Sequence, residues 1–274
     1  MDTLPSKIAI IAGEGTLPRE LHDACIEHNI DVHIVGLQDQ FDVDLFDGIK
    51  FDLVPIYGIS QIIKSIKKSG AKYIILAGKV TRSSIPKLIL DFKGAKLLAN
   101  ILRNGLSDTS LTQTIIKFLE NENFEVISPE IIAENILATP GNMTKIQIKK
   151  SHIKDMEQGY KMLGTICKLD VGQALVIQNG LILGIEAVEG TDDLIKRSGL
   201  IQQKINSEPV LIKRCKPHQD KRMDMPCIGE KTIKNMCKFG IKGIGLESGA
   251  CLILNKGKTL SLANECGIFI YGLK

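Results

Sequence analysis

The stretch KIAIIAGEG, residues 7–15, decides the fold of the first half of this 274-residue chain. It opens with a continuous apolar, β-branched run, which is typical of a strand buried on both faces of a parallel sheet. Gly13-Glu14-Gly15 then predicts a turn. Thr16 can cap a helix that begins at Leu17, because apolar residues recur at helical spacing as far as Cys25. The stretch therefore predicts a strand, a turn and a helix in succession.

The same alternation continues to about residue 140. Strands that alternate with helices predict a parallel, doubly wound sheet, so residues 1–140 are predicted to form a Rossmann-like nucleotide-binding domain. Such sheets bind ligands at the loops that leave the carboxyl ends of their strands, here Gly13–Thr16 and Gly78–Arg82. Further strands are predicted at 32–37, 72–77 and 124–128, and further helices at 59–69, 86–103 and 110–121.

A composition break at Thr139-Pro140-Gly141-Asn142 predicts a linker, because Pro and Gly interrupt the periodicity in a polar patch. Residues 146–274 are predicted to form a second α/β domain. Within it, Asn179-Gly180 between two apolar runs predicts a β-hairpin, because both residues tolerate a positive φ. Helices are predicted at 153–169, 192–206, 230–238 and 258–265, and strands at 174–178, 181–185, 209–214, 243–246, 251–254 and 267–271.

Composition narrows the classes of function. The chain is 44% apolar and 24% charged, as in soluble globular proteins, and no apolar run approaches the roughly twenty residues that cross a bilayer. Residues 1–145 carry 15 basic and 18 acidic side chains, whereas residues 146–274 carry 20 basic and 13 acidic ones. A basic second half with only 4% aromatic residues predicts a small anionic ligand and no nucleic acid. The seven cysteines, without a C-x-x-C pair, are expected to be reduced core thiols, and a start without a basic, cleavable leader predicts a cytoplasmic protein.

The glycine loop supplies the first candidate site. Gly13 and Gly15 let backbone N–H groups approach an anion at a helix N-terminus, where the helix dipole adds about 0.3–1 kcal/mol. A dinucleotide fingerprint is incomplete, because Pro18 occupies the third glycine position and no acidic residue cleanly ends the second strand. A phosphate or nucleotide cradle is favoured, with Lys79 and Arg82 at the neighbouring strand end as its cations. A nicotinamide-dependent oxidoreductase and a nucleotide-binding module without catalysis are the alternatives.

Four carboxylates gather where a predicted strand turns into a helix. Glu186, Glu189, Asp192 and Asp193 fall in the segment EAVEGTDD. Like charges at this density need a cation among them, and hard carboxylate oxygens suit Mg²⁺ or Mn²⁺. A helix cap explains them equally well, with Thr191 and the two aspartates facing the helix dipole. The residues alone leave both interpretations open.

The loop at residues 216–226, KPHQDKRMDMP, interleaves bases and acids between two prolines of the second domain. Such a loop can present Asp220 and Asp224 to a metal ion or a water molecule. Lys216 and Arg222 can hold phosphate oxygens at the same time. A merely solvated loop is the competing interpretation.

Six motifs, taken in order, resemble one family. They are AGEGTLP (12–18), GKVTR (78–82), DVGQALVIQNG (170–180), EAVEGTD (186–192), KPHQDKRMDMPCIG (216–229) and GIFIYG (267–272). Together they resemble the cytoplasmic UDP-2,3-diacylglucosamine pyrophosphatases of lipid A biosynthesis, of the type unrelated to the calcineurin-like phosphoesterases. Two departures stand out. Leu106-Ser107-Asp108 stands where the family usually has Gly-Asp-Asp, so that Asp108 keeps one of two carboxylates, and Ser83 stands where the family has Pro.

The resemblance implies hydrolysis of the pyrophosphate bond of a sugar nucleotide to UMP and 2,3-diacylglucosamine 1-phosphate, with Mg²⁺ or Mn²⁺. It also implies a cytoplasmic homodimer that can contact the inner membrane at its periphery. In this family the second domain is expected to bind the lipid sugar and to carry the catalytic residues. The catalytic residues that it implies are Asp220, Asp224, Lys216 and Arg222, and the metal ligands are Asp192, Asp220 and Asp224. The implied substrate-binding residues are Gly13, Gly15, Thr16, Leu17, Lys79, Arg82, Asp108, Gln173, Glu189, Gly190, Thr191 and Gln219.

Overall fold

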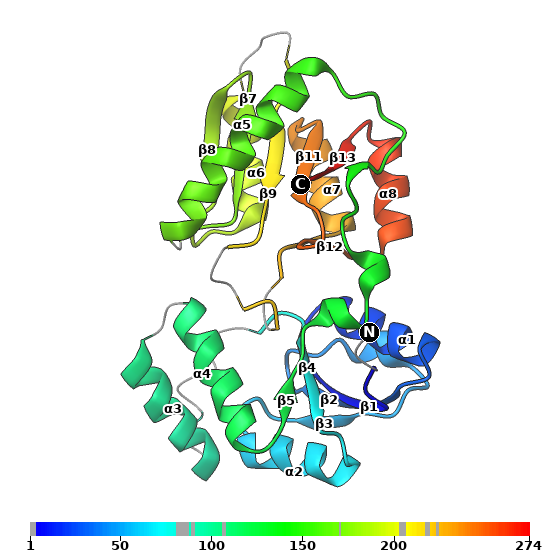
Figure 1. The fold of residues 1–274 in the computed structure, drawn as a ribbon, viewed down its shortest axis with the longest axis vertical. Helices are drawn as coiled ribbons and strands as arrows, with labels where there is room; N and C mark the ends of the chain where they lie inside the picture. Colours follow the sequence, from blue (N-terminus) through cyan, green and yellow to red (C-terminus); the bar gives the residue numbers. More distant parts are fainter. Residues whose placement is uncertain are drawn as a thin grey trace. The chain divides into compact units, whose positions relative to one another are not determined.

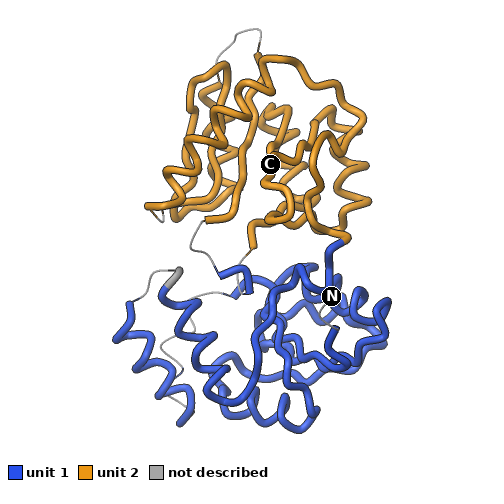
Figure 2. The backbone as a smooth tube through the Cα atoms, in the orientation of Figure 1, with its two compact units in different colours: residues 1–134, 220–224 blue, residues 135–219, 225–274 orange. Residues whose placement is uncertain are grey.

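The computed structural model divides the chain into two compact units (Figure 2). Unit 1 comprises Met1–Glu134 together with Asp220–Asp224, and unit 2 comprises Asn135–Gln219 together with Met225–Lys274. The structure describes residues 4–80, 88, 91–105, 108–169, 171–202, 207–216, 220–222 and 225–274, with the side chains of 108 and 109 left out. Within these ranges no helix combines the length and the apolar character that a membrane span needs.

Unit 1 is built on a parallel sheet of five strands in the order β3-β2-β1-β4-β5 (Figure 1). This is the strand order of a Rossmann-type half, which confirms the predicted fold class. The central strand β1 pairs in parallel with β2 on one side and with β4 on the other, so Ile8 lies between Val32 and Tyr73. The strands are β1 (Lys7–Ala12), β2 (Asp31–Leu37), β3 (Asp52–Val54), β4 (Tyr73–Ala77) and β5 (Glu125–Val126).

Helices cover both faces of this sheet. On one face, α1 (Leu17–Glu27) buries Leu21 and Cys25. The other face packs against α2 (Ile59–Ser69), α3 (Phe92–Asn104) and α4 (Asp108–Asn121) in one apolar core. The helix predicted to start at residue 86 begins at Phe92, because the Asp91 carboxylate accepts the backbone N–H of Gly94 at 2.9 Å and caps it. Among the described residues, short 3₁₀ turns also lie at η1 (Val43–Phe46), η3 (Pro129–Ile131) and η4 (Glu134–Ile136), the last of which crosses from unit 1 into unit 2.

Unit 2 contains a mixed sheet of six strands in the order β6-β13-β11-β9-β7-β8. Three central strands, β9, β11 and β13, are parallel, whereas β7, β8 and β6 pair antiparallel with their neighbours. A second α/β domain is therefore present, as predicted. The strands are β6 (Gly141–Asn142), β7 (Ala174–Gln178), β8 (Leu181–Ile185), β9 (Val210–Lys213), β11 (Gly243–Glu247) and β13 (Phe269–Leu273), with β10 (Cys227–Ile228) and β12 (Leu252–Ile253) as a small parallel pair.

Alternate residues of these strands face two separate cores. Ala174 and Val176 pack toward α6 (Thr191–Ile201), α7 (Glu230–Phe239) and α8 (Lys256–Glu265). Leu175 and Ile177 pack toward α5 (Lys150–Ile166), which continues into the 3₁₀ turn η5 (Cys167–Leu169). Each fully buried Val, Leu or Ile contributes about 1.5–3 kcal/mol, so both faces stabilise the sheet. Its strand ends are consequently held in fixed positions.

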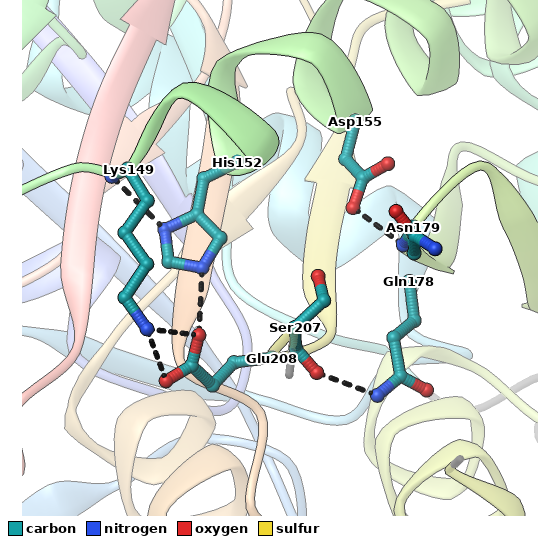
Figure 3. A network of polar contacts seen from close by, with 7 residues as sticks. All are labelled: Lys149, His152, Asp155, Gln178, Asn179, Ser207 and Glu208. Carbon is teal, nitrogen blue, oxygen red and sulfur yellow. Dashed lines mark hydrogen bonds and ion pairs between the residues drawn. The ribbon is translucent and has the colours of Figure 1, made fainter. Parts of the chain in front are cut away.

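The hairpin predicted at Asn179-Gly180 is confirmed. Asn179 has a φ of 48° and Gly180 a φ of 80°, the left-handed pair that a tight hairpin turn needs. Asp155 of α5, only 2% exposed, accepts the backbone N–H of Asn179 and that of Gly180, each at 2.7 Å. Figure 3 shows this carboxylate above the turn. A residue of the helix therefore fixes the turn that ends β7.

Replacing Asp155 with Ala is expected to lower the free energy of unfolding by about 2–3 kcal/mol, because the backbone N–H groups of Asn179 and Gly180 would both lose their carboxylate acceptor. Urea unfolding measures this loss. Glu157→Ala, at an exposed position of the same helix, is the matched control and should cost less than about 0.5 kcal/mol. Equal losses for the two variants would show that Asp155 does not hold the turn.

A second polar cluster, also drawn in Figure 3, joins the start of α5 to Glu208. His152 is 3% exposed, and its Nε2 lies 3.0 Å from Glu208 Oε2 while its Nδ1 accepts the backbone N–H of Lys149 at 3.4 Å. Lys149 Nζ also contacts the Glu208 carboxylate at 2.8 Å. Because both ring nitrogens have partners, this histidine ties the start of α5 to Glu208.

All seven cysteines are reduced thiols, as predicted. Burial raises the pKa of Cys25 to about 12, which keeps that thiol protonated and unreactive. The prediction that every cysteine lies in the core is wrong for Cys237, which is exposed.

Candidate functional site

Two glycine loops lie side by side at the carboxyl edge of the unit 1 sheet. Gly13 follows β1 and Gly78 follows the adjacent strand β4. The backbones of Glu14 and Lys79 exchange two hydrogen bonds, of 3.0 Å and 2.9 Å. A Cβ atom at Gly13 would lie 2.5 Å from the Lys79 carbonyl oxygen, so only glycine permits this approach. The structure therefore brings together two loops that the sequence predicted to share a ligand.

The N–H group of Gly15 is bound by a carboxylate that sequence reasoning missed. Gly15, with a φ of 103°, donates its backbone N–H to Asp42 Oδ2 at 2.6 Å. A loop at a helix N-terminus is expected to bind an anion. Here the anion is the Asp42 carboxylate of the same chain. Asp42 comes from the segment after β2, and its position gave no sequence signal.

The prediction that the Thr16 side chain caps the helix is wrong. The helix does begin at Leu17, but the Thr16 hydroxyl donates to Glu20 Oε1 at 2.9 Å and makes no cap hydrogen bond with the helix backbone. Thr16 has a φ of −82° and a ψ of −19°, already in the helical region, whereas a capping residue takes extended angles. Glu20 and Asp42 therefore place two carboxylates near this helix N-terminus.

Replacing Gly13 with Val is expected to lower the free energy of unfolding by about 3 kcal/mol, because the new side chain must displace the Lys79 carbonyl. Gly15→Ala is the control. Its Cβ would meet no atom within 4 Å, and only the positive φ costs roughly 1–2 kcal/mol. Urea unfolding of both variants compares the two costs, and a Gly13→Val loss no larger than that of Gly15→Ala would contradict the contact.

The sequence predicts that the loop at residues 216–226 belongs to the second domain as one segment. The structure instead divides this loop between the two units. Asp220–Asp224 group with unit 1, while the residues on either side belong to unit 2. Arg222 Nη1 contacts Glu120 Oε1 of α4 at 2.8 Å, a partner 102 residues away. The backbone carbonyl of Lys221 accepts from Ser128 Oγ at 3.1 Å. We refer to residues 220–222 as the strap.

The strap side chains bind one another and unit 1. Arg222 donates from Nε to Asp220 Oδ1 at 2.8 Å and from Nη2 to Asp220 Oδ2 at 2.6 Å. Hydrogen bonds from Arg222, opposed by burial, hold the pKa of Asp220 below its ordinary value. Arg222, predicted to hold phosphate, thus anchors the strap instead, and both oxygens of Asp220 are occupied. Asp224, Gln219 and Arg82, and the side chain of Asp108, lie outside the described residues.

A second set of predicted site residues meets at one edge of the unit 2 sheet. Lys213 ends β9 and is 6% exposed; its Nζ donates to Thr191 Oγ1 at 2.9 Å and to the Cys227 carbonyl at 3.1 Å. The Thr191 hydroxyl donates to Glu186 Oε1 at 2.5 Å. Glu186, also 6% exposed, accepts the backbone N–H of Gln173 at 3.0 Å. We call Lys213, Thr191, Glu186 and Gln173 the β9-edge cluster.

Arg214, the residue that follows β9, points to the opposite face of the sheet. The Arg214 guanidinium lies 4.2 Å from the centroid of the Tyr160 ring and 3.4 Å from Glu247 Oε1. Glu247 also accepts from the Tyr160 hydroxyl at 2.9 Å and from the Cys215 N–H at 2.8 Å. Burial and the Glu247 hydrogen bond raise the pKa of Tyr160 to about 12. Predicted Lys216 follows, half-buried, two residues further along.

Sequence reasoning missed Lys213, Arg214 and Glu247. The available signal was the strand VLIKR itself, in which two bases follow directly on a buried apolar run. Charged residues at such a position must find partners, because an unpaired buried charge is costly.

The acidic segment 186–193 does not form a metal site with the described residues. Asp192 accepts from Asn235 Nδ2 at 2.8 Å and contacts Lys231 Nζ at 2.8 Å, while Glu189 pairs with Arg197 at 2.8 Å. Burial opposes ionisation of Asp192, but the contacts with Lys231 and Asn235 hold its pKa below the ordinary value. Asp192 and Asp220 belong to different units. Across the described ranges, no three His, Cys, Asp or Glu side chains gather in a group that could hold a metal ion.

Models of known protein families match both halves of the chain. The model of the LpxI N-terminal domain matches residues 7–136, and that of the LpxI C-terminal domain matches residues 139–271. The chain belongs to the LpxI family. A LpxI protein of Caulobacter vibrioides, named UDP-2,3-diacylglucosamine pyrophosphatase, is 29% identical over 277 residues, which cover 97% of each chain. The family resemblance seen in the sequence is thereby confirmed.

Among solved structures, the UDP-glucose 4-epimerase of Thermus thermophilus in complex with NAD is similar over 53% of this chain and 40% of its own. Its TM-score is 0.27 and its sequence identity is 10%. At that level the likeness adds nothing to the fold assignment, which rests on the strand order.

Two groups of the predicted site residues are thus each assembled within one unit. The glycine loops of unit 1 hold Gly13, Gly15, Thr16, Leu17 and Lys79. The edge of the unit 2 sheet holds Gln173, Gly190 and Thr191, with Glu189 two residues before Thr191.

Proposed function

We propose that this chain is a UDP-2,3-diacylglucosamine pyrophosphatase of lipid A biosynthesis, which hydrolyses the pyrophosphate bond to give UMP and 2,3-diacylglucosamine 1-phosphate. One observation carries the proposal. The two LpxI domain models follow one another from residue 7 to residue 271, and the Caulobacter vibrioides pyrophosphatase aligns with 97% of the chain. A match at one domain alone would support only a nucleotide-binding module.

The roles of the two groups follow from their chemistry. Phosphoryl transfer depends on positioning and on neutralisation of charge more than on covalent chemistry. The Gly13–Leu17 loop, with Lys79 and Arg82, binds the nucleotide portion in this proposal. The β9-edge cluster binds the acylated sugar portion, and Lys216 binds its phosphate. One of the two carboxylates Asp220 and Asp224 acts at the reacting phosphate, with Gln219 as a neighbouring contact.

The divalent ion, the homodimer, the cytoplasmic location and contact with the inner membrane remain part of the proposal. For the ion, Asp192 and Asp220 do not fit as they stand, because each is already paired with a cation. No step of the reaction is therefore assigned to Mg²⁺ or Mn²⁺ here. The need for an ion is tested directly by its removal.

Purified protein incubated with UDP-2,3-diacylglucosamine in detergent micelles, with Mg²⁺ present, is expected to release UMP. Chromatography of the nucleotide products, with mass spectrometry of the lipid, measures the reaction. Binding of UMP without turnover would support the nucleotide-binding module instead. Oxidation or reduction of a nicotinamide cofactor by the protein would support the oxidoreductase.

A further inference from the structure

The hydroxyl of Thr191 has its proton direction fixed by two buried charged residues. Lys213 approaches Thr191 Oγ1 at 2.9 Å, and a lysine ammonium can only donate hydrogen bonds. Glu186 Oε1 lies 2.5 Å from the same oxygen, and an ionised carboxylate can only accept. The single hydroxyl proton must therefore point toward Glu186.

This direction leaves Thr191 with one kind of hydrogen bond to offer a ligand. A hydroxyl oxygen has one proton and two lone pairs. The proton and one lone pair are used within the β9-edge cluster, so one lone pair remains, on a residue that is only partly buried. The Thr191 hydroxyl can accept a hydrogen bond from a ligand and cannot donate one to a phosphate oxygen.

Gln173 offers a second acceptor in the same cluster. Its backbone N–H donates to Glu186 Oε2 at 3.0 Å, and its carbonyl accepts the N–H of Arg214 at 3.1 Å. Its side-chain oxygen Oε1 is buried, and no described residue donates a hydrogen bond to it. A buried acceptor without a donor is costly, so a ligand that supplies donors completes this cluster.

We propose that Lys213 and Glu186 are positioning residues that fix Thr191 as a hydrogen-bond acceptor for a hydroxyl or amide N–H of the substrate. The Thr191 hydroxyl then recognises the acylated amino sugar and takes no part in holding the pyrophosphate. This inference rests on the proposed function, because it takes UDP-2,3-diacylglucosamine as the ligand. It adds the orientation of the contact and the two residues behind it.

The first experiment compares Thr191→Val, which keeps the shape but loses the oxygen, with Thr191→Ser, which keeps the hydroxyl. Thr191→Val should raise the KM for UDP-2,3-diacylglucosamine about tenfold and leave kcat within about twofold, as loss of one ground-state hydrogen bond does. Thr191→Ser should stay within about twofold of the wild type. An unchanged KM in a folded Thr191→Val protein would overturn the proposal.

Inorganic pyrophosphate is the matched probe, because it carries phosphate oxygens without a sugar hydroxyl or an amide. Its inhibition constant should be the same for the wild type and for Thr191→Val. A rise that matches the rise in KM would mean that Thr191 donates to phosphate, which contradicts the fixed proton direction.

The second experiment tests whether Lys213 acts through Thr191. Lys213→Met should raise KM about fivefold in the wild-type background and leave it unchanged in the Thr191→Val background, since coupled residues are not additive. A residue that only stabilises the sheet edge would change KM equally in both backgrounds, and that outcome overturns the proposal. If Lys213→Met does not fold, as judged by its melting temperature, Glu186→Gln replaces it in the same cycle.

Failure of the two proposals can be told apart. If the wild type releases no UMP, the proposed function fails. The calorimetric Kd of UDP-2,3-diacylglucosamine then replaces KM in the comparison of Thr191→Val with Thr191→Ser. A weaker Kd for Thr191→Val alone still supports the acceptor role, and equal Kd values overturn it.

Discussion

Replacing Asp224 with Asn is expected to lower kcat by about 10³-fold while the protein stays folded. Of the two carboxylates predicted to act at the reacting phosphate, Asp220 has both oxygens occupied by Arg222, at 2.8 Å and 2.6 Å. Asp224 is then the one left to serve as a base or a metal ligand. Steady-state release of UMP at saturating substrate measures the loss.

Asp220→Asn is the informative companion. Because Asp220 acts through Arg222 in holding the strap, its loss is expected to cost less than about tenfold in kcat. Asp47→Asn, at an exposed carboxylate of unit 1, is the matched control and should leave the rate unchanged. If Asp224→Asn keeps wild-type activity with saturating metal while Asp220→Asn loses it, the roles are reversed. If both retain activity, neither Asp220 nor Asp224 is the catalytic carboxylate.

Removal of divalent ions with EDTA is expected to stop the release of UMP, and added Mg²⁺ or Mn²⁺ should restore it. A divalent ion held at Asp224 would neutralise charge on the phosphate oxygens more fully than one lysine does. Rates measured across a titration of each ion give the preferred metal. A full rate in EDTA, with no metal found by elemental analysis, would rule the ion out.

Calorimetric binding of UMP provides the control for this removal. In the proposed function the glycine loop, Lys79 and Arg82 bind UMP without an ion, so the affinity for UMP should change little in EDTA. A parallel loss of UMP binding would mean that the ion holds the nucleotide rather than supporting the reaction.

The sequence by itself determined most elements of both units, although it did not predict the short strands β3, β6 and β10. The run KIAIIA is β1 with its predicted bounds, Lys7–Ala12, and Asn179-Gly180 is the predicted hairpin turn. Gly70 ends α2 with a φ of 80°, as its position predicted. These features depend on the spacing of apolar residues and on the angles that Gly and Asn tolerate, which act over a few neighbouring residues. Structure that depends on such local interactions can be predicted from the sequence.

The family was also recognisable from the sequence, because six motifs in order carry more information than any one of them. The motifs did not show which of their side chains are free to contact a ligand. Arg222 looked like a phosphate-binding residue, yet it pairs with Asp220 and with Glu120. Thr16 looked like a helix cap, yet its hydroxyl donates to Glu20.

Tertiary structure alone decided the partners of the charged groups. The strap groups with unit 1 although unit 2 flanks it in the chain, and its partner Glu120 lies 102 residues away. Asp42 reaches Gly15 from 27 residues away, and Lys213 reaches Thr191 from 22. Any base can pair with any acid that folding brings within hydrogen-bond distance, so residue spacing does not specify these pairs. Packing of each sheet against its own helices specifies these pairs. It fixes where each strand ends and therefore which charged side chains lie close enough to neutralise one another.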